Sequence, residues 1–195
     1  MDVLKASLHR YLNVARDALV WKLDGLSEYQ IRRPLTPTGT NLLGIVKHVA
    51  SVEVGYLGDV FGRPSGIELP WFAPEAAPNE DMWATEDESR ESILDLYRRV
   101  REHDDATIEA LSLDDTGEVS WWPEDRRVVT LGQILVHVTT ETHRHAGHAD
   151  IVRELIDGAV GIRSDNSNVW AGEEADYWPR YVEMLEGVAR RAGGQ

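Results

Sequence analysis

Histidine and glutamate side chains crowd the stretch TETHRHAGHADIVRE, which spans residues 140–154. If this stretch is helical, at about 100° per residue, Glu141, His145 and His148 lie on one face. His137 joins that face from the preceding turn. Glu141 and His145 are one turn apart, the spacing at which two helical side chains can bind the same ion. Because imidazole and carboxylate groups are ligands of catalytic zinc, the stretch predicts part of a metal site.

Aliphatic residues indicate which way this face points. Ile134 and Val152 fall on the same side of the helix and mark it as buried, whereas His143 falls opposite and is expected in solvent. An isolated buried carboxylate is costly to remove from water. Glu141 must therefore be paired, hydrogen-bonded or bound to a cation.

A third ligand is available in the stretch LLGIVKHVASVE, where His48 stands between Ile45 and Val49 and faces the core. His48, Glu141 and His145 on two antiparallel helices would leave coordination positions open, as a catalytic metal requires. The competing interpretation is that these histidines are hydrogen-bonded core residues, the commoner fate of a single histidine on an apolar helix face. The residues alone leave both interpretations open.

Five segments with helical apolar periodicity must carry these side chains. They cover residues about 3–26, 41–62, 85–111, 130–156 and 174–190, with a polar loop over 164–170. The linker over 63–82 is rich in proline and long for a compact domain, which makes it a candidate part of a binding site. The linker over 114–130 is expected to form a loop with a short strand pair. The pattern predicts an all-α, bundle-like single domain.

Aromatic pairs stand in both linkers, Trp71 with Phe72 in the first and Trp121 with Trp122 in the second. Such pairs either line a pocket or pin a loop to the body of the protein. We favour the pinning role for both pairs, because it is the commoner one.

Composition limits the classes of partner. The chain has 195 residues, 20 lysines and arginines against 34 aspartates and glutamates, and a net charge of −14. Nucleic acid is not an expected partner, because phosphate binding needs clustered basic side chains. No apolar run approaches the roughly 20 residues that span a bilayer, and the amino-terminal stretch reads as a helix rather than a signal peptide. A cytoplasmic protein without membrane contact is expected.

Cysteine is absent from the sequence, which rules out a disulfide framework and a thiolate ligand. Any thiol chemistry must therefore use a small-molecule cosubstrate.

Three stretches of the chain look familiar together: LLGIVKHVASVE, LDLYRRV and VTLGQILVHVTTETHRHAGHADIVRELIDG. They resemble the DinB-like superfamily of metal-binding four-helix bundles, and within it the branch related to mycothiol-dependent enzymes, which includes the maleylpyruvate isomerase-like N-terminal domain. The resemblance implies an up-down-down-up-type bundle over about 1–158, with a C-terminal extension over about 159–195 of the same single domain (1–195). It also implies the metal ligands His48, Glu141 and His145, in the Glu-x-x-x-His version of the motif.

The activity implied by the resemblance is a divalent-metal-dependent thiol S-transferase. A low-molecular-weight thiol of the mycothiol kind would add to an electrophile, with the metal activating the thiol as thiolate. Zinc is the foremost metal, and nickel, manganese and iron also suit the ligands. The alternatives are a metal-dependent hydrolase on the same site, or a non-catalytic bundle that binds a metal or small ligand. Members of the superfamily often pair, so a homodimer is compatible with the resemblance.

Residues beside the triad receive roles in the same way. His148 is a candidate for contacting substrate, and Arg144 for meeting an anionic group of substrate or forming an interhelical salt bridge. His137 could orient Glu141 by a hydrogen bond, or be a core residue. The isomerases of this branch carry a further C-terminal domain for which this chain is too short, so its tail is expected to be a loop and a helix packed on the bundle.

Overall fold

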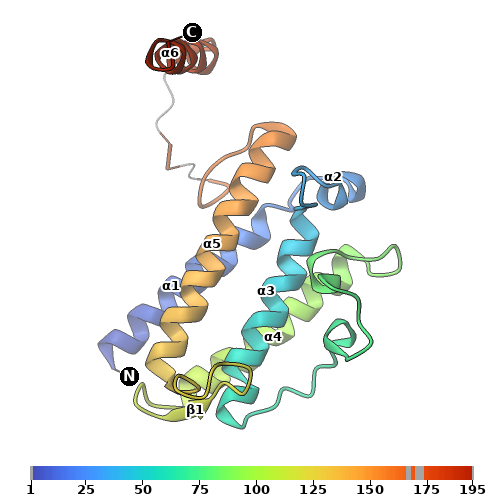
Figure 1. Ribbon diagram of the computed structural model, residues 1–195, viewed down its shortest axis with the longest axis vertical. Coiled ribbons are helices and arrows are strands. Elements are labelled where there is room, and N and C mark those ends of the chain that lie inside the picture. The colour runs from blue at the N-terminus through green and yellow to red at the C-terminus, as the bar shows by residue number, and fades with distance from the viewer. Residues whose placement is uncertain (1, 166–167, 170–173, 195) are drawn as a thin grey trace.

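The computed structural model describes residues 2–165, 168–169 and 174–194, and it is mostly helical (Figure 1). The predicted all-α class is confirmed, with one short antiparallel strand pair, β1 Thr116–Glu118 and β2 Val128–Thr130. The helices are α1 Val3–Trp21, α2 Glu28–Arg32, α3 Leu42–Leu57, α4 Arg90–Ala110, α5 Leu131–Asp157 and α6 Tyr177–Ala192. Three short 3₁₀ helices are η1 Asp59–Phe61, η2 Pro70–Phe72 and η3 Glu80–Met82.

The two helices that carry the predicted ligands have well-defined ends. The Asn41 side chain caps α3 by accepting a hydrogen bond from the Gly44 backbone N–H. Thr130 and Gln133 form a capping box at the start of α5, and Gly158 ends that helix in the left-handed conformation. Both helices therefore follow the predicted boundaries closely, except that α3 ends at Leu57 and η1 completes the predicted segment.

Two other predicted boundaries are wrong. The first helix stops at Trp21 rather than near residue 26, because the chain turns through Gly25, whose φ is positive. The third long helix begins at Arg90 rather than near residue 85. The Glu88 carboxylate accepts a hydrogen bond from the Thr85 backbone N–H, which holds residues 85–88 in a turn. The short helix α2, with its own capping box, was also not predicted.

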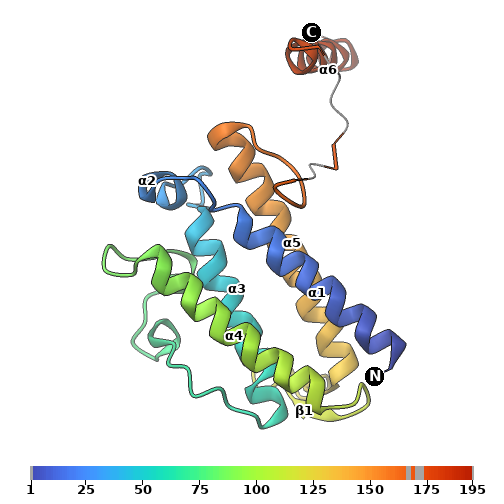
Figure 2. The ribbon, with the colours of Figure 1, turned by 180° about the vertical axis from the view of Figure 1, so that it is seen from behind.

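The four long helices α1, α3, α4 and α5 enclose the core. Helix α1 packs along α5, and α3 packs against both α4 and α5. Seen from behind, α1 and α4 lie in front of the other two helices (Figure 2). The core is aliphatic where α3 meets its neighbours, with Leu42, Val46 and Ala50 fully buried. Most residues of α3 are buried, as expected of a helix packed against two neighbours.

A network of buried charges also crosses this core. Arg16 of α1 donates to Glu53 of α3 at 2.8 Å and to Asp104 of α4 at 3.3 Å. Glu53 also accepts hydrogen bonds from the hydroxyl groups of Tyr97, at 3.0 Å, and Thr142, at 2.9 Å. All four long helices are therefore joined by one set of buried polar contacts, which the sequence did not reveal.

The tail does not pack as predicted. Helix α6 forms near the expected position, but none of its residues is buried, and it stands apart from the bundle in Figure 1. The prediction that it packs on the bundle is therefore wrong. The polar loop predicted over 164–170 lies partly outside the described residues. Within the part of the chain that the structure describes, no helix has the length and apolar character needed to cross a bilayer.

Candidate metal centre

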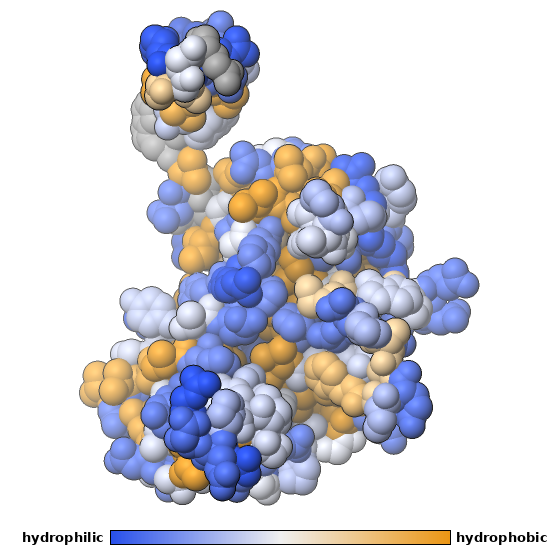
Figure 3. Space-filling model, in the orientation of Figure 1, coloured by the Kyte–Doolittle hydropathy of each residue, from blue (hydrophilic) through white to orange (hydrophobic). Residues whose placement is uncertain are grey.

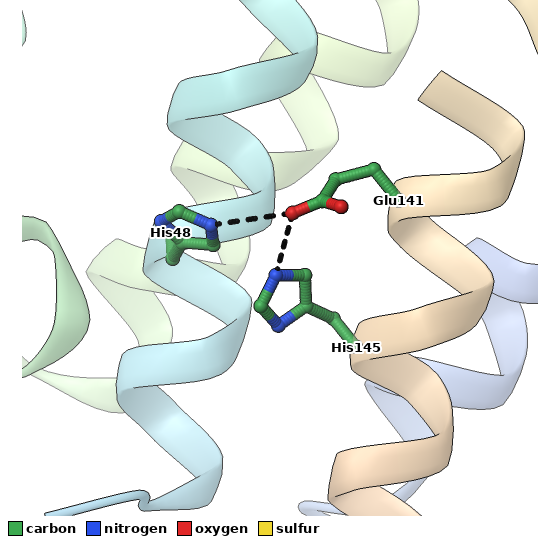
Figure 4. Close-up of side chains that lie close together, drawn as sticks. All are labelled: His48, Glu141 and His145. Atoms are coloured by element: carbon green, nitrogen blue, oxygen red, sulfur yellow. Dashed lines mark hydrogen bonds and ion pairs between the residues drawn. The ribbon is translucent and has the colours of Figure 1, made fainter. Parts of the chain in front are cut away.

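The three predicted ligands come together between α3 and α5 (Figure 4). The Nε2 atom of His145 lies 2.8 Å from Oε1 of Glu141, and the Nε2 atom of His48 lies 4.0 Å from the same oxygen. One ligand atom from each residue lies within 4.8 Å of the others. The antiparallel packing of α3 and α5 therefore brings together the side chains that were predicted to face the core on each helix.

The triad is only partly shielded from solvent. The side chains of His48, Glu141 and His145 are 18%, 30% and 7% exposed. Burial lowers the pKa of His145, and the nearby His48 ring lowers it further, against the opposing effect of Glu141. His145 therefore favours the neutral form, which has a lone pair to offer.

These residues fit a divalent metal ion. Two imidazole nitrogens and one carboxylate oxygen are a common ligand set for zinc, and ligands at about 2.1 Å from one tetrahedral ion lie about 3.4 Å apart. The distances of 2.8 Å and 4.0 Å bracket that value. A lone pair on His145 Nε2 facing a carboxylate oxygen at 2.8 Å is repelled unless a proton or a cation is shared between them. Both the donor set and its spacing thus suit a cation.

A fourth residue, Asp81, orients the triad and was missed in the sequence. Its Oδ2 atom lies 2.6 Å from Nδ1 of His48 and accepts the proton of that nitrogen. This contact leaves Nε2 of His48 as the atom that faces Glu141, in the carboxylate–histidine arrangement typical of metal sites. Asp81 belongs to the Pro-rich linker that the sequence marked as a candidate part of a binding site, but nothing in the linker distinguished it from the neighbouring acidic residues.

The backbone around Asp81 lies very close to α3. A Cβ atom added at Gly44 would come within 1.8 Å of the Met82 carbonyl oxygen, so any larger residue at position 44 would displace this segment. The Asn41 amide donates to the same carbonyl at 3.1 Å, and Lys47 donates to the Trp83 carbonyl at 3.0 Å. These contacts hold η3 and its carboxylate against the helix that carries His48.

The other predicted site residues lie beside the triad. The His148 ring contacts the His145 ring edge-on, at 5.3 Å between centroids, and is half-buried. Arg144 is 62% exposed, and its guanidinium lies 4.0 Å from Glu141 of its own helix. Among the described residues, this intrahelical contact is the ion pair that Arg144 makes, and no interhelical salt bridge is formed there. His143 is exposed, as predicted.

His137 does not orient Glu141. Its ring packs against the rings of Tyr56, at 4.7 Å, and Trp122, at 5.2 Å. Among the described contacts there is no hydrogen bond from His137 to Glu141, so the packing role predicted for it is the correct one.

The linker aromatics divide between the two predicted roles. Trp71 pins its linker, since its Nε1 donates to Ser51 Oγ at 2.8 Å and Lys47 lies over its ring at 4.0 Å. Trp122 donates to the Tyr56 hydroxyl at 3.0 Å and pins the second linker in the same way. Phe72 and Trp121 remain more than half exposed.

Comparison with known proteins identifies a family for this chain. No curated protein and no solved structure matches the chain. The family model described as Mycothiol-S-transferase (MST) matches residues 7–158, from the first turns of α1 to the glycine that ends α5. This match covers most of the chain and both helices of the triad. The chain therefore belongs to the mycothiol S-transferase family, within the DinB-like superfamily.

Proposed function

We propose that this protein is a divalent-metal-dependent thiol S-transferase, in which His48, Glu141 and His145 hold the metal. The observation that carries the proposal is the convergence of three metal-binding atoms within 4.8 Å, in a chain without cysteine that belongs to the mycothiol S-transferase family. Family membership supports mycothiol, or a thiol like it, as the cosubstrate. Zinc is the foremost metal, with nickel, manganese and iron also compatible with two imidazoles and one carboxylate.

A divalent ion held here would lower the pKa of a bound thiol, so that the sulfur reacts as a thiolate at neutral pH. In the transfer, a sulfur–carbon bond forms, the electrophile's leaving group departs with its bonding electrons, and the thiol proton passes to a base or to solvent. We assign Asp81 the role of keeping His48 in the orientation that offers Nε2. With Glu141 as the only anionic ligand, a divalent ion and its three protein ligands would carry a formal charge of +1, which would favour binding of a thiolate.

His148 and Arg144 are our candidates for contact with the substrates. His148 borders His145 on the face of α5 that carries the triad. It could receive the thiol proton or donate a hydrogen bond. Arg144 is exposed one helical turn from His148, within reach of an anionic group on a bound thiol.

We also propose the remaining features that the family resemblance implies. The bundle would span about 1–158 with its long helices in up-down-down-up order, and about 159–195 would extend the same single domain. The pairing of α1 with α5 and of α3 with α4 and α5 supports this order, and the family match ends at residue 158. A homodimer and a cytoplasmic location stay predictions.

The metal content of the purified protein tests the proposal. Protein made without a histidine tag should hold close to one equivalent of metal, by mass spectrometry, or take it up from zinc or nickel. Glu141→Gln should lose that metal, whereas Glu154→Gln, an exposed glutamate of the same helix, should keep it. Consumption of mycothiol with an electrophile should follow metal content. Wild-type protein that stays metal-free after soaking, or equal metal in Glu141→Gln, contradicts the proposed site.

A further inference from the structure

A hollow of about 800 Å³ opens beside the triad, between the second half of α3 and the linker that follows it. Its walls are mainly apolar and aromatic. They include Val52, Tyr56, Ile67, Leu69, Phe72 and Trp121. Figure 3 shows apolar side chains, in orange, gathered on this side of the molecule at the lower right. A hollow of this size and composition lies within the range of small-molecule sites.

The hollow adjoins the triad along α3. Val52 follows His48 by one helical turn on the same face, about 6 Å along the axis. Tyr56 follows by one further turn, and its ring contacts His137, which precedes Glu141 by one turn of α5. A molecule in the hollow would therefore have one end next to the triad.

The walls of the hollow are held in place by contacts behind them. The Tyr56 hydroxyl accepts hydrogen bonds from the Trp122 indole, at 3.0 Å, and the Trp121 indole, at 3.4 Å. On the opposite side, the bond from Trp71 to Ser51 anchors the linker that carries Phe72. The shape thus exists before any ligand arrives, while the rings of Phe72 and Trp121 stay largely exposed and available for contact.

The charge of the hollow limits what it can bind. Asp59 is the charged residue among the described residues that line it, and the chain as a whole carries a net charge of −14. An anionic ligand is disfavoured by both, whereas a flat uncharged ring can stack against three aromatic side chains.

We propose that this hollow binds the electrophile, and that the electrophile is an uncharged aromatic molecule. This inference rests on the transferase function proposed for the triad, which would present the thiol at the end of the hollow. The triad supplies the thiol side of the reaction, and the hollow selects the acceptor.

A binding measurement without thiol tests the hollow separately from the metal. The probe is meta-dinitrobenzene, an uncharged aromatic molecule that is unreactive toward thiols. Equilibrium dialysis measures how tightly the protein binds it. Gly55 lines the hollow, and a Cβ atom added there meets only the Trp121 ring, at 3.8 Å. Gly55→Leu should therefore fill the hollow without disturbing α3 and weaken binding by about tenfold or more. Gly147→Leu is the matched control, because Gly147 is a glycine of α5 that does not line the hollow, and a Cβ atom added there has open space around it.

His48→Ala separates the two proposals. It should bind meta-dinitrobenzene like wild type even though the metal is lost, since His48 does not line the hollow. Dinitrobenzoate, the anionic counterpart, should bind several times more weakly than the neutral probe. Asp59→Asn removes a negative charge from the hollow and should therefore reduce this difference in affinity. Equal binding by Gly55→Leu and Gly147→Leu, or tighter binding of the anion, overturns the inference and leaves the metal site untouched.

Discussion

Two polar clusters connect α3 to α5, and they differ in how completely their groups are paired. In the first, Glu53 accepts three hydrogen bonds, including one from Thr142 of α5, and its side chain is 1% exposed. In the second, His48 faces Glu141 and His145 across the same helix pair, the Nδ1 atom of His145 has no hydrogen-bond partner among the described residues, and Glu141 is 30% exposed. The first cluster is closed, and the second is open.

The difference separates a structural role from a binding role. A buried charge is tolerated when all its partners are present. Burial alone would lower the pKa of the Arg16 guanidinium, but the carboxylates of Glu53, Asp104 and Asp105 raise it above its ordinary value. A group of ligands that is accessible and short of partners still has bonds to offer. Histidine and carboxylate residues can thus either hold the bundle together or bind a ligand, depending on what surrounds them.

Arg16→Met should have the largest effect, because it leaves Glu53 buried without its counter-ion. We expect the free energy of unfolding to fall by about 4 kcal/mol, measured by urea denaturation. Arg98→Met, at an exposed arginine of α4, should leave the unfolding curve unchanged. Similar curves for the two variants would mean that the closed cluster contributes nothing to stability.

The closed cluster should also make stability depend on pH. Burial raises the pKa of Asp104 to about 7, and Glu53 adds to this effect, against the lowering by His103 and Arg16. Between about pH 4 and pH 7 the folded protein therefore holds a proton that the unfolded chain releases, so stability falls as pH rises. The free energy of unfolding should fall by at most about 4 kcal/mol over this pH range.

Asp104→Asn should remove this pH dependence. The difference between wild-type and variant free energies of unfolding should shrink from pH 4 to pH 8. Asp104 also raises the pKa of His103. The two side chains are in contact, at 3.3 Å, and titrate as a pair. The folded pair loses its extra protons as pH rises, so both pKa shifts change stability in the same direction. A difference that grows with pH would refute the assignment.

Asp81→Ala should weaken zinc binding by about 10- to 100-fold, because His48 loses the carboxylate that orients it. Competition with a chromogenic chelator measures this directly. Asp81→Asn should recover part of the affinity, since its amide oxygen can still accept a hydrogen bond from His48. Glu75→Ala, an exposed acidic residue of the same linker, should bind zinc like wild type. If Asp81→Ala also binds zinc like wild type, Asp81 does not orient His48 for metal binding.

Glu141→Gln should have the smallest effect on the metal-free protein, within about 0.5 kcal/mol in free energy of unfolding. Glu53→Gln makes the same chemical change in the closed cluster, where it leaves Arg16 short of a partner, and should cost about 3 kcal/mol. Urea denaturation in the presence of a chelator compares the two. Equal losses would show that the open cluster is a structural one.

The candidate metal ligands could be predicted because their arrangement depends mostly on local geometry. The angular positions of Glu141 and His145 follow from the helical repeat alone, and the aliphatic residues around them identify the buried face. The same reasoning selected His48 on α3. The family resemblance favours metal binding by these histidines over packing in the core, a choice that the residues alone left open.

Contacts between distant parts of the chain could not be predicted in this way. Asp81 reaches His48 across 33 positions, Arg16 reaches Glu53 across 37, and α6 remains unpacked although its sequence is amphipathic. Each depends on which surfaces meet when the helices pack, whereas periodicity reports only which side of a helix is apolar. The sequence by itself therefore determined the helices and the faces on which their histidines lie. The tertiary structure decided which charges are closed off by partners and which stay open to a ligand, because pairing in three dimensions depends on distances that a one-dimensional pattern does not contain.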